Sequence, residues 1–384
     1  MTTRNHALDS LRGIAALQVL LCHGLLLYAP VLFDLNGPAL TVVRSPISTL
    51  WDGGLAVCLF FVISGYVLTF AYSSATPAIA HVGSRVVRLA LPAFLSCCLA
   101  AALIGLFGYS APEAAALVPG NTGLGVGPTP GLGLPDIVTD TLRAVFLGYS
   151  PIGPASQLQW EAPSNLLALN PVLWTLSIEF WGSLIILALT RIHPLVRTQA
   201  AVVALVYFVG SFYGLFLAGY LAASAPRAQR LVGGIPPWGC ILLLIFGVWS
   251  AHPSNLASAQ WLNFACGASP SWFAPCGPYP GKALGSLALF FGVLGSAPIL
   301  RVLALPPMRR LGALSFPLYL VHFPIIATVS AGVALALAPN VGVGLAYGTA
   351  FVLAICLSIA VAFGFIQVDL LAIGLARRTK AKLT

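Results

Sequence analysis

The chain has 384 residues, of which 59% are hydrophobic and 7% are charged, and its mean hydropathy is +0.96. Soluble domains carry roughly 25% charged residues, so this composition excludes a water-soluble globular protein and indicates one that lies mostly in a lipid bilayer. Lysine and arginine outnumber aspartate and glutamate by 18 to 9. These basic residues lie mainly in short connections between apolar runs, which indicates orientation in a membrane and not binding to nucleic acid.

Apolar runs recur along the chain, and many are long enough to cross a bilayer, which takes about 20 residues in a helix. We predict nine strong spans, at 11–31, 54–73, 90–110, 170–190, 199–223, 236–251, 283–304, 311–337 and 341–375. A weaker run, 137–150, follows a stretch rich in glycine and proline. The sequence therefore predicts an all-α, polytopic membrane protein in which residues 1–384 form a single transmembrane domain.

Basic residues flank several of these spans. They are Arg4, Arg12, Arg85, Arg88, Arg227, Arg230, Arg301, Arg309, Arg310, Arg377, Arg378, Lys380 and Lys382. Cytoplasmic loops of membrane proteins carry an excess of lysine and arginine, so we place all of these residues on the cytoplasmic side of an inner membrane, with both termini in the cytoplasm. This orientation requires an even number of crossings. We predict about ten transmembrane helices, the tenth being either 137–150 or a broken hairpin within 199–223.

The long connections 32–53, 111–136 and 252–282 then face outward. Cys266 and Cys276 share the last of these connections. They could form a disulfide if that loop faces an oxidising compartment, and otherwise they are free thiols. None of the eight cysteines forms a close pair of the metal-binding kind, so we predict no metal site.

The first span carries two ionisable residues, which are costly in a membrane unless they are paired or hydrated. Arg12 lies near its start, and His23 follows eleven residues later. Eleven residues of α-helix return to nearly the same face, about 16 Å farther along the axis. One stripe of this helix therefore carries a cation near the cytoplasmic boundary and an imidazole deeper in the membrane. The alternative is an arginine that extends back to the interface and a histidine that only packs.

Two further segments carry charge into the spans. Arg85 and Arg88 share a helix face, so their guanidiniums can bind one phosphate group together; simple flanking charge is the alternative. Glu179 is the only acid in the span 170–190, and it needs a hydrated cavity or a partner from another helix. His23 and Arg12 are the partners that the sequence offers, and a protonated structural glutamate is the alternative.

Five short motifs follow one another along nearly the whole chain. They are Leu8-Asp9-Ser10-Leu11-Arg12-Gly13-Ile14-Ala15-Ala16 with His23, Phe60-Phe61-x-x-Ser64-Gly65-Tyr66, Arg85-x-x-Arg88 with Pro92, Trp174-x-Leu176-x-x-Glu179, and Gly312-x-x-Ser315-x-x-x-Tyr319-Leu320-x-His322. Each motif is weak by itself, and the order of all five is specific. Together they resemble the membrane-bound acyltransferase-3 family.

This resemblance implies transfer of an acyl group, usually acetyl from acetyl-CoA in the cytoplasm, to a hydroxyl of a glycan, a lipid-linked sugar or a glycosylated small molecule. The resemblance also implies that His23 is the residue that transfers the proton. We expect Glu179 to orient the imidazole, Arg12 to stabilise phosphate or the developing oxyanion, and Arg85 with Arg88 to hold the phosphates of CoA. Direct transfer and an acyl intermediate on His23 both stay open. So do the acceptor, the acyl chain, the oligomeric state and the role of His322.

Two other classes of function fit the same residues. A transporter or flippase for a sugar or glycolipid also uses histidine and glutamate inside the membrane, although the sequence shows no pair of matching halves. A membrane subunit without catalytic activity, acting as a scaffold, would tolerate replacement of His23 and Glu179.

Overall fold

The computed structural model describes residues 6–34, 37–43, 45–72, 75–121, 124, 132–148, 168–252 and 280–384. The longer helices are α1 (His6–Tyr28), α3 (Gly53–Ala71), α4 (Ala78–Phe107), α7 (Thr175–Arg191), α15 (Pro306–Ile325) and α17 (Val343–Lys382). The shorter ones are α2 (Leu40–Val43), α5 (Ala111–Ala116), α6 (Leu134–Leu142), α8 (Pro194–Tyr207), α9 (Phe212–Ser224), α10 (Pro226–Gly233), α11 (Pro237–Ala251), α13 (Pro280–Gly295), α14 (Ala297–Leu303) and α16 (Ala331–Val341). The tight 3-10 or π turns are η1 (Pro30–Phe33), η2 (Pro46–Trp51), η3 (Arg143–Leu147), η4 (Pro171–Trp174) and η5 (Ile326–Ser330).

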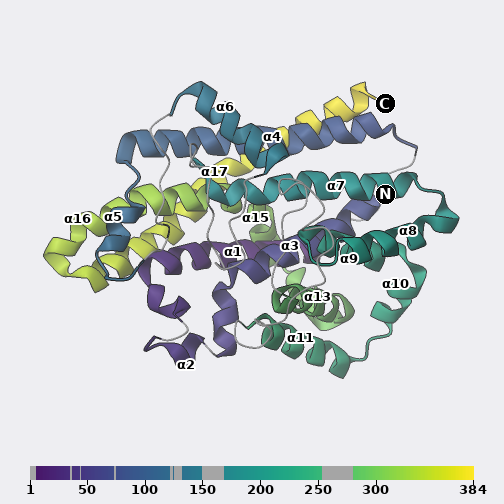
Figure 1. Ribbon diagram of the computed structural model, residues 1–384, viewed down its shortest axis with the longest axis horizontal. Coiled ribbons are helices and arrows are strands. Elements are labelled where there is room, and N and C mark those ends of the chain that lie inside the picture. The colour runs from purple at the N-terminus through teal and green to yellow at the C-terminus, as the bar shows by residue number, and fades with distance from the viewer. Residues whose placement is uncertain are drawn as a thin grey trace.

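These ranges contain no β-strand, so the predicted all-α fold is confirmed for the described part of the chain. The helices form an elongated bundle in which α1, α4, α7 and α17 extend along the long axis, with α11 and α13 to one side (Figure 1). The start of α1 and the end of α17 lie at the same end of the bundle (Figure 1). The end of α17 packs there on α4, where Gly83 lies against Thr379 and Leu383.

The number of crossings differs from the prediction. Within the described residues, six helical stretches are long and apolar enough to cross a membrane: α1, α3, α4, Pro171–Arg191, Pro306–Val341 and α17. Two more pairs of helices are long and apolar enough to cross only when each pair is taken together. Both pairs are sharply bent, α10 with α11 by 101° and α13 with α14 by 92°. If each bent pair is one span, these residues contain up to eight spans. The chain is thus a multi-pass membrane protein, and ten crossings are not confirmed.

Both segments that were expected to supply the tenth crossing are interrupted or short. The predicted span 199–223 breaks near Ser211 into α8 and α9, of 14 and 13 residues. Each is about 20 Å long, against roughly 30 Å for the hydrocarbon core, so this segment forms two short helices. In the other segment, residues 137–147 form most of α6 and the π turn η3. The cysteines Cys266 and Cys276 lie outside the described residues.

Helices α1 and α15 run parallel and in close contact because glycines face each other across the interface. A Cβ atom on Gly13 would lie 2.6 Å from the carbonyl carbon of Leu311, and one on Gly312 would lie 2.6 Å from the carbonyl carbon of Asp9. Small residues permit such close approach of two backbones in membranes. Ten residues farther along both helices this parallel register brings His23 beside His322.

A second glycine contact joins α3 to α9. A Cβ atom on Gly65 would clash with the carbonyl oxygen of Phe216, and one on Gly219 would clash with that of Val62. Gly65 belongs to the motif that also contains Ser64, so close packing fixes the rotation of α3. That rotation directs Ser64 towards Arg12 of α1.

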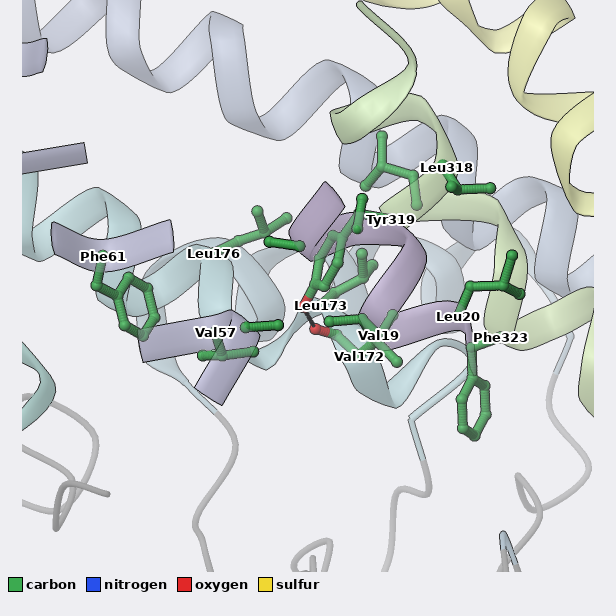
Figure 2. Close-up of a cluster of buried hydrophobic side chains, with 14 of the residues drawn as sticks. Val19, Leu20, Val57, Phe61, Val172, Leu173, Leu176, Leu318, Tyr319 and Phe323 are labelled. Carbon is green, nitrogen blue, oxygen red and sulfur yellow. Dashed lines mark hydrogen bonds between the residues drawn. The ribbon is translucent and has the colours of Figure 1, made fainter. Parts of the chain in front are cut away.

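An apolar cluster fills the centre of the bundle between α1, α3, α7 and α15. Figure 2 shows its buried side chains, which include Val19, Leu20, Val57, Phe61, Val172, Leu173, Leu176, Leu318, Tyr319 and Phe323. On α1 these side chains lie between Arg12 and His23, and on α15 they lie next to His322. The cluster therefore separates the charged end of the bundle from the two histidines.

Candidate active site

Three arginines from two helices gather at the end of the bundle where α1 starts. This arginine cluster consists of Arg12 on α1 with Arg85 and Arg88 on α4. Nη2 of Arg12 donates a hydrogen bond to the hydroxyl of Ser64 at 2.6 Å. Both α4 arginines lie close enough to act electrostatically on the guanidinium of Arg12.

Each arginine of α4 has a carboxylate partner from another helix. Arg85 pairs with Glu179 of α7, and Arg88 pairs with Asp369 of α17. The four side chains are 15–27% exposed, so the pairs are reachable from outside the core. Arg88 also stacks over the ring of Phe316, with its guanidinium carbon 5.2 Å from the ring centroid.

The arginine cluster retains hydrogen-bond donors without a partner. Nε of Arg12 and Nε of Arg85 are both buried and unpaired within the described residues. Arginine has five N–H donors and no acceptor, and a buried donor without a partner costs about 1–3 kcal/mol. The cluster can therefore accept a further anion, whose oxygens would satisfy these donors.

Glu179 lies in this charged cluster and not beside the histidine that it was expected to orient. Its contacts are the ion pair with Arg85 and an electrostatic interaction with Arg12. The position of Glu179 along α7 explains this. Thr175 of the same helix contacts α15, where its hydroxyl lies 2.7 Å from the hydroxyl of Tyr319. Glu179 follows Thr175 by four residues, or about 6 Å towards the end that carries the arginines.

His23 has a histidine partner instead. Its Nδ1 lies 3.0 Å from Nε2 of His322, and the two rings are stacked with their centroids 5.2 Å apart. Nδ1 of His322 lies in turn 3.0 Å from the carbonyl oxygen of Leu318. His322 is fully buried, whereas His23 is half-buried. Nε2 of His23 makes no hydrogen bond to a described residue.

Polar side chains brace α15 where proline interrupts its hydrogen bonding. Pro324 has no N–H, so the carbonyl of Leu320 four residues earlier loses its helical partner. Ser96 of α4 and Asn170 donate to that carbonyl at 2.7 and 2.8 Å, and Asn170 also donates to Ser96 at 2.8 Å. The π turn η5 begins at Ile326, and such turns are frequent near functional sites. These contacts hold the segment that carries His322.

Sequence reasoning missed several of these residues. Asp369 is the only acid in the run 341–375, the same signal that singled out Glu179. Pro324 in the sequence indicates that the Leu320 carbonyl lacks its helical partner, but it does not indicate that Ser96 and Asn170 are the donors to that carbonyl.

Another ion pair lies far from the arginine cluster, where Asp52 caps the start of α3 and pairs with Lys282 at 2.9 Å. Within the described residues, no group of three or more potential metal ligands occurs.

Comparison with known families supports the resemblance that the motifs indicated. Residues 5–366 match the profile of the acyltransferase-3 family, described as an acyltransferase domain. No curated protein and no solved structure gave a match. Since the matched residues cover nearly the whole chain, including all five motifs, the chain belongs to the acyltransferase-3 family of membrane acyltransferases.

Proposed function

We propose that this protein is an O-acetyltransferase of the cytoplasmic membrane. It would move an acetyl group from acetyl-CoA to a hydroxyl of a glycan, a lipid-linked sugar or a glycosylated small molecule. The observation that carries the proposal is one stripe of α1. Arg12 lies on it among guanidiniums with unpaired donors, and His23 lies about 16 Å farther along the same face.

The arginine cluster is the proposed site for the phosphates of the donor. Coenzyme A carries several phosphates, and arginine forks bind phosphate oxygens well. Arg85 and Arg88 would exchange their carboxylate partners for these oxygens, while the unpaired Nε atoms of Arg12 and Arg85 would gain acceptors. Because Arg12 lies about 16 Å from His23, it suits the phosphates better than the developing oxyanion.

The apolar cluster lies between the arginine cluster and His23, and we assign to it the pantetheine arm of the donor. The pantetheine arm of CoA carries no charge and must reach from the phosphates to the thioester. Val19 and Leu176 are buried along the way (Figure 2). An apolar passage also excludes water, which limits hydrolysis of the thioester. The side chains of this cluster would part to admit the arm.

His23 is the proposed general base. Its Nε2 takes the proton from the acceptor hydroxyl while the hydroxyl oxygen bonds to the thioester carbonyl carbon. The tetrahedral intermediate then collapses, the carbon–sulfur bond breaks, and the departing sulfur takes the proton from His23. The products are the acetylated acceptor and CoA with a free thiol, and the histidine returns to its neutral form.

The proposed orientation has both termini in the cytoplasm. The starts of α1 and α4 and the end of α17 lie together, and α17 ends in the basic residues Arg377, Arg378, Lys380 and Lys382. Cytoplasmic ends carry such residues. The donor would therefore enter from the cytoplasm, and the acceptor would reach His23 from deeper in the membrane or from the other side.

A transfer assay tests the proposal. Purified protein is incubated with acetyl-CoA labelled in its acetyl group and with a pool of candidate acceptors, and His23→Ala serves as the control. Label should pass to an acceptor with the native protein only. If label leaves CoA no faster than with His23→Ala, the enzymatic role is wrong. Mass spectrometry of glycans from cells with and without the gene would then name the acceptor by the loss of one acetyl mass.

A further inference from the structure

We infer that His322 is a positioning residue that fixes the tautomer of His23, so that Nδ1 of His23 carries the proton and Nε2 carries the lone pair. This inference rests on the proposed role of His23 as a general base, because only that role requires the lone pair at Nε2. It goes further by assigning a function to the second histidine and to the backbone carbonyl behind it.

The backbone carbonyl of Leu318 fixes the tautomer of His322. The carbonyl oxygen of Leu318 can only accept a hydrogen bond, and it lies 3.0 Å from Nδ1 of His322. Nδ1 of a neutral His322 must therefore carry the proton. A neutral imidazole has one N–H and one lone pair, so Nε2 of His322 carries the lone pair.

The tautomer of His322 in turn fixes that of His23. Nε2 of His322 lies 3.0 Å from Nδ1 of His23 and can only accept from it, so Nδ1 of His23 is the donor. Nε2 of His23 is then the unprotonated nitrogen, which is the form that a general base needs. The carbonyl of Val19, one turn earlier on α1, is the other acceptor near this ring.

A histidine in this position does what an acid does in a serine-protease triad, where the acid holds the imidazole in one tautomer and orientation. His322 is fully buried, and a carboxylate there would place a negative charge inside the membrane. A neutral ring accepts the same hydrogen bond without that charge. When His23 takes up a proton, the bond from its Nδ1 becomes charge-assisted and strengthens.

The pair is held by packing on both sides. The glycine contact between Gly13 and Leu311 sets the distance between α1 and α15. The rings of His23 and Phe323 are nearly perpendicular, with centroids 5.4 Å apart. Ser96 and Asn170 hold the Leu320 carbonyl two residues before His322. His322 therefore meets His23 in one fixed geometry.

The test measures the tautomer directly. Protein labelled with ¹⁵N in its six histidines is examined by NMR, and the His23 signals are identified as those absent from His23→Gln. The native protein should show His23 protonated at Nδ1. His322→Leu, which cannot accept a hydrogen bond, should shift His23 to a mixture of tautomers. His322→Gln, whose side-chain oxygen can accept, should preserve the Nδ1 proton.

Kinetics give the second readout. In His322→Leu, kcat should fall by roughly 10²- to 10⁴-fold, the contribution that general acid–base catalysis typically makes, with CoA binding unchanged. His322→Gln should recover most of the rate. His322→Met replaces the leucine variant if that one does not fold. The inference is overturned if native His23 is protonated at Nε2. It is also overturned if the apolar variant keeps the Nδ1 proton, in which case the Val19 carbonyl suffices. The tautomer result stands whether or not acyl transfer is found, so the two proposals can fail separately.

Discussion

Replacing Glu179 with glutamine distinguishes two roles for this carboxylate. If Glu179 competes with the donor phosphates for Arg85, as the ion pair suggests, its neutralisation should tighten CoA binding. If it supports His23, as its isolation in the sequence suggested, CoA binding should stay the same and catalysis should fall. Glutamine keeps the size of the side chain and removes only the charge.

The structure sets the size of the expected effect. Two unit charges 4 Å apart interact by about 1 kcal/mol in water and about 4 kcal/mol near a protein surface. The side chains of Arg85 and Glu179 are 15% and 18% exposed, which places the pair between these limits, and the lost hydrogen bond offsets part of the gain. We expect a net change of about 1–2 kcal/mol, which is roughly a 5- to 30-fold decrease in the Kd for CoA.

Isothermal titration of detergent-purified protein with CoA measures this change. Asp52→Asn is the matched control, because Asp52 also forms an ion pair but lies twelve residues of α3 from Ser64, or about 18 Å along the helix. Its CoA affinity should equal that of the native protein. The reasoning is refuted if Glu179→Gln leaves the Kd for CoA unchanged and its loss of rate is not additive with that of His23→Gln. Non-additive losses would show that Glu179 acts through His23.

The other predictions concern the donor site and the packing that positions the histidines. Arg88→Ala should weaken CoA binding by roughly tenfold, equivalent to about 1.4 kcal/mol, while Asp369→Asn should strengthen it. If titration shows the native Kd for CoA in both variants, Arg88 is not part of the donor site. Gly13→Val should lower thermal stability strongly, because its Cβ would lie 2.6 Å from the Leu311 backbone, whereas Gly348→Ala, with nothing within 4 Å, should be neutral in the same melting assay. Ser96→Ala should cost about 0.5–1.5 kcal/mol of stability, because the Leu320 carbonyl loses one of its two donors and keeps Asn170. Pro324→Ala restores an N–H to that carbonyl, so the cost of Ser96→Ala should shrink in the double variant, and purely additive losses would count against this account of the proline.

Features that depend on one helix were predictable from the sequence, and features that depend on two helices were not. The common face of Arg12 and His23 follows from the helical repeat alone. Glu179 was recognised as a charge inside a span, and His23 and Arg12 were its predicted partners, whereas the structure pairs it with Arg85. The choice depends on the relative depth of α7, which the position of Thr175 against Tyr319 sets.

Bends in the spans were missed for a related reason. Hydropathy averages over a window and does not register direction, so α13 and α14 looked like one span although they meet at 92°. The local signal was Ser296 followed by Pro298, which suits the start of a new helix. Likewise, the role of His322 depends on contacts with α1 and with its own Leu318 carbonyl, and neither can be read from its motif.

The central claim is that Nε2 of His23 removes the proton of the acceptor hydroxyl during acyl transfer from CoA. Its most direct test is the release of CoA thiol that depends on acceptor, compared between the native protein and His23→Gln. Titration must first show that both proteins bind CoA equally. We predict rapid release by the native protein and none above background by His23→Gln. Release at the native rate by His23→Gln would contradict the account.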